Sequence, residues 1–337
     1  MSYLKSEISY CLSSEKISNE ELSSRFPDAS GVEIFKKTGI SIRYQTMGEV
    51  VASDLGLAAA KKLFRENNID TSKIDYVIYV SSCLDYKCPT TACIIQHELG
   101  LNKGIGAIDI LHGCTGYIYG LSSAKGLIAT GQAENVLLIT ADSVTKMVHP
   151  DDLELLSIFS DAGAACLISK DQLGLSAEIG SFTFGTDGGG ENNIKISRSG
   201  MKNPTDAKWF EKHKDVPSGM KWGHLTMNGS QIFIFAIRRI PNLVDEILKK
   251  ENLSKDDIDL FIFHQANGVM LDFLRSKLKI PKKKFYFNIA NKGNTVSASI
   301  PIALKDAFDE GLIKRGNKVL LVGFGIGYSW GGTVIKY

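Results

Sequence analysis

The sequence predicts a mixed α/β fold built from two copies of one unit. Short apolar runs rich in β-branched residues alternate with segments whose apolar residues recur at helical spacing, a pattern typical of buried strands joined by helical crossovers. Segments of the second half also resemble segments of the first half at a nearly constant offset. The chain has 337 residues, of which 44% are hydrophobic and 23% charged, enough for two core-bearing halves. We expect these halves to cover residues 1–175 and 176–337.

The composition excludes several classes of protein. The formal net charge of +2 gives no basis for a polyanion-binding surface, so nucleic acid is not expected as a partner. No apolar run reaches the about 18 residues of a membrane-spanning helix, and the first ten residues lack the features of a signal peptide. The six cysteines lack the paired short spacings of a zinc site. We therefore expect a cytoplasmic protein with reduced thiols, without a metal and without a membrane partner.

The elements of the first half follow from periodicity and from turn residues. Residues 18–35 predict a short helix and a turn. After them we expect, in order, an extended piece at 39–43, helix 50–68, strand 74–80, helix 90–99, strand 105–111, helix 115–130 and strand 135–140. The glycine-rich stretch 185–190 and the polar segment that follows it to about residue 222 are interpreted as an insertion without regular structure.

The internal repeat predicts which loops of the two halves meet. Three pairs of segments match: 60–79 with 245–263, 108–114 with 288–294, and 131–138 with 316–321. Ile74 falls on Ile258 in the first pair, and Cys114 falls on Asn294 in the second. If the copies pack about a pseudo-twofold axis, their equivalent loops meet, so Cys114 and Asn294 should face one cleft.

Cys114 is the candidate nucleophile. It follows an expected strand and a His112-Gly113 turn, and it opens a helix in which Tyr117, Leu121, Ala124 and Ile128 share one face. The N–H groups and positive dipole end of a helix lower the pKa of a thiol below its free value of about 8.5. We therefore expect a thiol with a lowered pKa. A small buried core residue is the alternative, because most free cysteines are of that kind.

His264 and Asn294 are candidate hydrogen-bond donors. His264 closes the apolar run Leu260–Phe263, and Asn294 opens a run of small residues in Gly293–Ser299. A buried histidine is commonly a satisfied core residue, and an asparagine after glycine is commonly a turn residue. Their positions at strand ends beside a helix-tip thiol favour donors that face a reacting oxygen.

Four motifs together resemble β-ketoacyl-acyl-carrier-protein synthase III of the thiolase superfamily. They are Gly113-Cys114-Thr-Gly116, His264-Gln-Ala-Asn267, Gly293-Asn294-Thr295 with Ser297-Ala-Ser299, and Phe324-Gly-Ile-Gly-Tyr-Ser-Trp-Gly331. The resemblance runs in order from about residue 40 to residue 337. It implies a thiolase-like, five-layered α-β-α-β-α fold with two pseudo-duplicated halves, and a homodimer.

The resemblance also implies a reaction. Cys114 takes an acyl group from an acyl-coenzyme A or acyl-carrier-protein thioester, and malonyl-carrier-protein then loses CO₂ and attacks it. His264 and Asn294 stabilise the enolate, while the backbone amides of Cys114 and Ile326 hold the oxyanion at the acyl carbon. No cofactor is implied beyond these substrates. A thiolase-fold acyltransferase that passes the acyl group to a hydroxyl or an amine is the alternative.

Several residues depart from the family pattern at positions that bind the acyl donor. Members that load from coenzyme A commonly carry Trp and Arg where this chain has Glu33 and Lys37, and their later arginines fall here on Leu153 and Val269. An aromatic plane and cations that hold phosphates are thus missing. We expect a carrier protein or an unusual coenzyme A ester as the donor, and a specialised pathway.

The acyl pocket and the carrier surface complete the expected site. The position of a phenylalanine that the partner subunit usually lends to cap the acyl pocket matches Cys88, so we expect a longer tunnel and acyl groups larger than acetyl. Phe233 is assigned to the same pocket. The expected carrier or coenzyme A surface comprises Lys37, Asn267, Arg275 and Lys277, with further basic residues at 279 and 282–284. His112 either packs or tunes the thiol.

A papain-like peptidase also has Cys, His and Asn in this order. Such enzymes place the cysteine near the mature N-terminus, in a secreted domain with disulfides. The internal duplication has no place in that fold, and we reject this interpretation.

Overall fold

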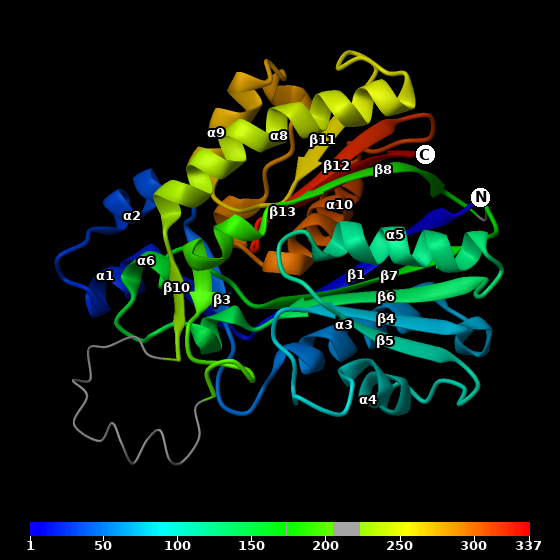
Figure 1. Cartoon of the computed structure of the whole chain (residues 1–337), viewed down its shortest axis with the longest axis horizontal. Helices are drawn as coiled ribbons and strands as arrows, with labels where there is room; N and C mark the ends of the chain where they lie inside the picture. The colour runs from blue at the N-terminus through cyan, green and yellow to red at the C-terminus, as the bar shows by residue number, and fades with distance from the viewer. Residues whose placement is uncertain (173, 205–222) are drawn as a thin grey trace.

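The computed structural model describes residues 1–172, 174–204 and 223–337. Its main feature is a sheet of nine strands in the order β11-β12-β13-β8-β1-β7-β6-β4-β5 (Figure 1). The strands of this sheet are β1 Tyr3–Leu12, β4 Tyr76–Ser81, β5 Gly106–Leu111, β6 Asn135–Asp142, β7 Ala162–Ser169, β8 Ser176–Thr186, β11 Leu260–Phe263, β12 Lys318–Gly325 and β13 Ser329–Lys336. Two small sheets pair β2 Glu15–Ser18 with β3 Ile42–Gln45 and β9 Ile194–Ile196 with β10 Leu225–Met227.

The α-helices connect these strands. Among the described residues they are α1 Asn19–Arg25, α2 Gly31–Thr38, α3 Ala52–Asn67, α4 Thr91–Glu98, α5 Gly116–Ala129, α6 Leu153–Leu156, α8 Gly229–Glu251, α9 Gly268–Lys277 and α10 Ser299–Asp309. In the part of the chain with described coordinates, no helix combines the length and the apolar character that crossing a bilayer requires.

The strand order shows the duplication. From the centre outward the first half reads β1-β7-β6-β4-β5, and the second half reads β8-β13-β12-β11. β4 is parallel to β6 as β11 is parallel to β12, while β7 and β13 are antiparallel to their neighbours in both halves. Where the second half would have its fifth strand, Phe285 makes a single parallel bridge to Phe261. We propose a boundary near residue 175, in the loop between β7 and β8.

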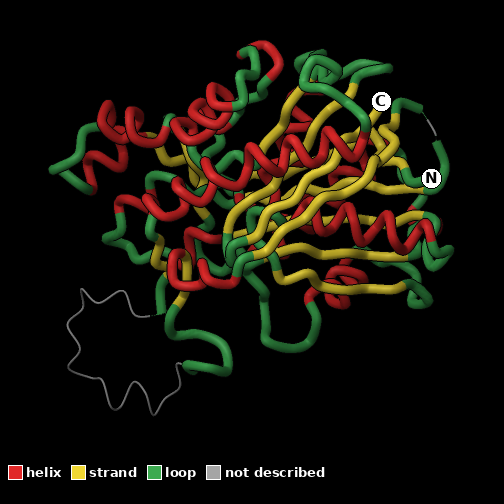
Figure 2. Tube along the Cα trace, turned by 45° about the horizontal axis from the view of Figure 1, so that its top comes forward, coloured by secondary structure: helices red, strands yellow, loops and turns green. Residues whose placement is uncertain are grey.

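The helices and the two halves of the sheet form the five layers of a thiolase-like fold. α3 packs on β1, β6 and β7, and α8 packs on β8, β12 and β13. α5 contacts strands of both halves, β4 to β7 on one side and β12 and β13 on the other, and α10 contacts β1, β7 and β11. α5 and α10 therefore form the middle layer, and Figure 2 shows the strands fanning out with helices on both sides. The predicted fold class is confirmed.

The local sequence explains the middle layer. Tyr117, Leu121, Ala124 and Ile128, which were predicted to share one face of a helix, are all buried in α5. They pack with residues of β4, β6 and β12 in one core cluster. Burial on both faces also explains why β6 has the apolar run Val136–Ile139, since helices α3 and α5 cover its two sides.

The N-terminal region differs from the prediction. Residues 3–12 form β1, a central strand that the sequence did not reveal, because Leu4 and Ile8 are the only apolar residues between positions 4 and 9. The pairing of β1 with β7 also shifts register between these two residues. Residues 31–38 form a second helix, α2, where only a turn was expected. Its N-cap Ser30 and its Glu33 make a reciprocal capping box.

The predicted insertion is more regular than expected. β8 extends to Thr186, and a 3-10 helix covers Gly188–Asn193 before β9 begins. The remainder of that expectation, residues 205–222, lies outside the described residues.

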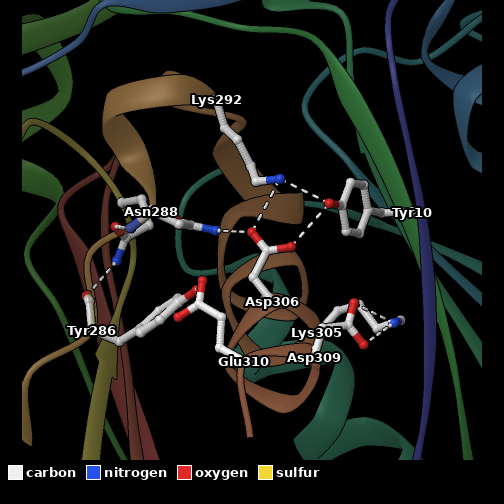
Figure 3. A network of polar contacts seen from close by, with 9 residues as sticks. Tyr10, Tyr286, Asn288, Lys292, Lys305, Asp306, Asp309 and Glu310 are labelled. Carbon is white, nitrogen blue, oxygen red and sulfur yellow. Dashed lines mark hydrogen bonds and ion pairs between the residues drawn. The ribbon is translucent and has the colours of Figure 1, made fainter. Parts of the chain in front are cut away.

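A polar network fixes the segment that leads to Asn294 (Figure 3). Asp306 of α10 accepts hydrogen bonds from the Tyr10 hydroxyl at 2.9 Å and from Asn288 Nδ2 at 2.9 Å. Lys292 Nζ lies 3.1 Å from the same carboxylate and donates to the Tyr10 hydroxyl at 2.8 Å. The network therefore joins β1 of the first half, α10, and the loop two residues before Asn294.

We predict that Asp306→Ala lowers the free energy of unfolding by about 2 kcal/mol, because it strands the half-buried Lys292 ammonium without its anion. Asp309→Ala is the matched control on the same helix. It breaks only the exposed i,i+4 pair with Lys305 and should cost less than about 0.5 kcal/mol. Urea titration of both variants provides the measurement, and equal losses would contradict the assigned role of the network.

Candidate active site

Cys114, His264 and Asn294 line one cavity of about 480 Å³. They come from different elements: Cys114 precedes α5, His264 follows β11, and Asn294 follows the segment that bridges to β11. Their side chains are nearly excluded from solvent, with 7%, 1% and 5% of their surface exposed. The structure thus brings together a sulfur from the first half and an imidazole and a carboxamide from the second.

Tight contacts hold Cys114 between the halves. A methyl group at Gly325, the last residue of β12, would lie 2.5 Å from Cys114 Cβ and 2.9 Å from its Sγ. A methyl group at Gly113 would lie 3.1 Å from Ile326 Cδ1 and 3.3 Å from Val296 Cγ1. A side chain at position 325 would therefore displace Cys114, and one at position 113 would crowd Ile326 and Val296, because the strand end and loop of the second half pack directly on the turn that contains Cys114.

The expected lowering of the thiol pKa is wrong for the free protein. Burial, and after it the nearby Asp142 carboxylate, raise the pKa of Cys114 to about 12. Hydrogen bonds from the backbone of Cys114 and Ile326 oppose this rise without reversing it. The helix terminus contributes less than the desolvation of a fully enclosed sulfur, so the resting side chain is a neutral thiol.

His264 is also neutral at rest. Burial lowers the pKa of His264 to about 3. Its Nδ1 shares a hydrogen bond of 2.6 Å with Ser299 Oγ, and its backbone N–H donates to Val322 O of β12 at 2.7 Å. The ring is therefore oriented by α10 and by the edge of β12.

Asn294 is fixed by backbone and side-chain bonds. Its N–H donates to Ile158 O, and its carbonyl accepts from the Ser160 N–H, both at 2.9 Å. Its Oδ1 accepts from the Val296 N–H at 2.9 Å, which identifies Nδ2 as the donor end of the amide. Nδ2 donates one hydrogen to Ala266 O at 3.2 Å, and an amide nitrogen carries a second.

The mouth of the cavity gathers the positions that depart from the family pattern. Glu33, Lys37, Leu153 and Val269 all line it. Hydrogen bonds from the backbone and hydroxyl of Ser30 lower the pKa of the Glu33 carboxyl, which is therefore ionised at neutral pH. Asn267 and Phe233, both proposed from the sequence, are in the lining as well.

Glu154 is a mouth residue that the sequence reasoning missed. It lines the same cavity and follows Leu153, which the family comparison had singled out. Its position in the short helix α6 directs it toward the start of α8, where its Oε1 would lie 3.1 Å from a methyl group at Gly229. Adjacency to Leu153 was the only signal that could have identified it.

Several expected residues lie away from this cavity. Cys88 is exposed and is absent from the lining formed by its own chain. Arg275 pairs with Asp272 at 2.9 Å and donates to Ile280 O, and Lys277 donates to Ile237 O, so both side chains are engaged along α9.

His112 also lies away from both cavities that reach Cys114. Its ring stacks on Tyr119 with 4.5 Å between ring centroids. Burial lowers its pKa, so it is uncharged at neutral pH. Of the two roles considered for His112, the contacts favour packing.

A second cavity of about 210 Å³ also reaches Cys114. It shares Phe159, Ile194 and Ile326 with the first cavity and is otherwise mainly apolar, with Val144, Met147, Leu225 and Val296 in its wall. The thiol therefore lies between a chamber with a polar mouth and a chamber with an apolar wall. Among the described residues, no group of His, Cys, Asp or Glu side chains is arranged to hold a metal ion.

Comparisons with known proteins identify the family of this chain. Residues 108–188 match the family described as 3-oxoacyl-[acyl-carrier-protein] synthase III, and residues 248–337 match its C-terminal region. A β-ketoacyl-[acyl-carrier-protein] synthase III of Clostridium perfringens is 36% identical over 95% of this chain and 94% of that protein. This chain belongs to the β-ketoacyl-[acyl-carrier-protein] synthase III family.

Solved structures agree with the assignment. A crystal structure of a 3-oxoacyl-(acyl-carrier-protein) synthase III has a TM-score of 0.93 and 36% identity, covering 100% of this chain and 99% of that one. The synthase III from Aquifex aeolicus has a TM-score of 0.85 and 29% identity, covering 100% of both chains. The chain is thus a condensing enzyme of the transferase class.

We predict that Gly325→Ala slows alkylation of Cys114 by iodoacetamide at least about tenfold, because the added methyl group displaces Sγ. Mass spectrometry of the Cys114 peptide separates this thiol from the exposed Cys88 and Cys93. Gly126→Ala in α5, which meets nothing within 4 Å, is the control and should leave the rate unchanged. Equal rates in the two variants would show that β12 does not confine the sulfur.

Proposed function

We propose that this enzyme loads an acyl group on Cys114 and condenses it with malonyl-carrier-protein to a β-ketoacyl-carrier-protein. The observation that supports this function is the convergence of Cys114, His264 and Asn294 on one enclosed cavity. A single sulfur nucleophile with two neutral donors suits a reaction that forms an acyl thioester and then an enolate.

In the loading step, the Cys114 sulfur attacks the thioester carbonyl and forms the new C–S bond. The oxyanion of the tetrahedral intermediate lies against the backbone amides of Cys114 and Ile326, the two groups that already bond the resting thiol. The bond to the donor thiol then breaks, and the proton from Cys114 ends on that leaving group.

In the condensation step, the malonyl carboxylate leaves as CO₂ and its bonding electrons form an enolate. The neutral imidazole of His264 and the Nδ2–H of Asn294 donate to the enolate oxygen. The enolate carbon attacks the acyl carbon and Cys114 leaves as thiolate, which a proton restores to the thiol. One donor of this kind is worth on the order of 3 kcal/mol in a dry site.

The mouth of the cavity supports a donor other than ordinary acetyl-coenzyme A. The ionised Glu33 and the nearby Glu154 repel phosphates. Among the described residues that line this cavity, Lys37 is the only lysine or arginine. A pantetheine arm on a carrier protein brings one phosphodiester to this surface, whereas coenzyme A brings a whole nucleotide. We propose an acyl-carrier protein or an unusual coenzyme A ester as donor, in a specialised pathway.

Incubation of the protein with a panel of acyl-coenzyme A and acyl-carrier donors, followed by intact-protein mass spectrometry, tests loading. We expect an acyl adduct from carrier donors that is absent in Cys114→Ala, and little adduct from acetyl-coenzyme A. Comparable acylation by both, with micromolar affinity for acetyl-coenzyme A, contradicts the proposed donor. CO₂ release from malonyl-carrier-protein separates condensation from transfer to a hydroxyl or an amine.

A homodimer is part of the proposal. β5 is the last strand in the sheet order, and Leu111 at its end has 67% of its surface exposed. Leu84 and Tyr86, in the loop that precedes Cys88, are exposed large apolar side chains as well. An apolar strand edge of this kind suits pairing with a second copy, which would bring its Cys88 to the second cavity.

We predict that wild-type protein accepts acyl groups larger than acetyl, because the second cavity continues past Cys114 and Cys88 is smaller than a phenylalanine. Cys88→Phe should shift selectivity toward shorter chains in a series of acyl donors. Cys93→Phe, at another exposed cysteine, is the control and should not shift it. Unchanged selectivity in Cys88→Phe removes Cys88 from the acyl pocket.

A further inference from the structure

Asp142 is a fully buried carboxylate at the end of β6 that the reaction steps above do not use. Its Oδ1 accepts from the Ser82 N–H at 2.8 Å and from the Ser82 hydroxyl at 2.5 Å. Its Oδ2 accepts from the Ser297 N–H at 3.0 Å and from the Ser297 hydroxyl. The carboxylate thus uses each oxygen to hold one serine, and the two serines belong to different halves of the molecule.

Both serines adjoin the active site. Ser82 lines the second cavity together with Cys114. Ser297 follows Val296, a buried β-branched residue with a φ of +52°, in the left-handed region that such residues avoid. Val296 N–H is also the donor that orients the Asn294 amide. The bonds from Ser297 to Asp142 therefore anchor the strained turn that aims Asn294.

We infer that Asp142 is a positioning residue for the condensation step, holding the Asn294 turn of the second half against the first half through Ser297. This inference rests on the proposed function. Loading of Cys114 depends on the amides of Cys114 and Ile326, which Asp142 does not contact, whereas condensation depends on Asn294. Loss of Asp142 should therefore separate the two steps.

The charge of Asp142 supplies an independent readout. Asp142 raises the pKa of Cys114, second only to burial, so a neutral residue in its place should lower the thiol pKa and make the thiolate more available near neutral pH. Cys83 and Tyr79 are the other titratable groups whose pKa this carboxylate raises. Cys83 Sγ lies 3.6 Å from Oδ1, and its alkylation must be followed separately.

Asp142→Asn presents one NH₂ group and one oxygen to two backbone N–H donors, so one side of the clamp must fail. We expect single-turnover condensation to fall at least about tenfold, loading to be retained or faster, and alkylation of Cys114 at pH 8 to rise at least about threefold. Equal losses in both steps, or an unchanged pH profile of Cys114 alkylation, would overturn the inference.

Asp161→Asn is the matched control. Asp161 is equally buried and accepts from the backbone and hydroxyl of both Thr46 and Thr145, all within the first half. We expect it to lose stability without separating the two steps and without shifting the alkylation profile. A shift of the same size in Asp161→Asn would trace the effect to lost stability and would also overturn the inference.

Two serine variants decide the matter if Asp142→Asn does not fold. Ser297→Ala should slow condensation while loading is retained, and Ser82→Ala should not. Equal effects of the two variants on condensation contradict the inference. If the wild-type protein itself releases no CO₂ from malonyl-carrier-protein, the proposed function is wrong. If the wild-type protein condenses normally and Ser297→Ala condenses at the same rate, only the role of Asp142 is wrong.

Discussion

The enclosure of one sulfur between two halves of the chain is the constraint on which the site depends. Cys114 lies in a turn of the first half, and Gly325 and Ile326 of the second half close on it from the other side. The helices α5 and α10 fill the space between the halves and fix this approach. Because the sulfur is almost excluded from bulk solvent, the charges that form during the proposed reaction must be stabilised mainly by protein donors.

That enclosure explains the charge state of the resting site. A buried thiol with a pKa near 12 and a buried imidazole with a pKa near 3 are both neutral, so the free enzyme stores no ion pair at its centre. In the proposed reaction, negative charge arises at this centre only in the intermediates, first on the carbonyl oxygen of the acyl group attached to Cys114 and then on the enolate oxygen. Neutral donors that are already oriented bind such charges without a counter-ion in the ground state.

Sequence patterns revealed the topology of the site because periodicity and duplication are properties of the chain itself. Helical spacing placed α5 after Cys114, and the offset between repeats placed Asn294 opposite it. The central strand β1 was missed because its first half contains few apolar residues, and Lys5 is buried only through a hydrogen bond to Asp171 O in the folded state. The thiol pKa was predicted in the wrong direction because burial, the larger cause, is a tertiary property. Glu154 and Asp142 were missed for the same reason, since only packing brings them to the cavities.

Duplication also assigns different duties to the two halves. In the proposed reaction, the first copy contributes the nucleophile Cys114 and the second contributes the donors His264 and Asn294, so neither half alone contains all three groups. A small displacement of one copy relative to the other would leave the Cys114 thiol and its amide intact but would move His264 and Asn294 away from the acyl group. Polar links that cross between the copies, at Asp306 under the Asn294 loop and at Asp142 beside it, lie where such a displacement matters most. Burying a carboxylate costs desolvation free energy, but a buried carboxylate can accept directional hydrogen bonds from several donors at once. Their concentration around the Asn294 segment is therefore best explained by a requirement for alignment rather than for stability alone.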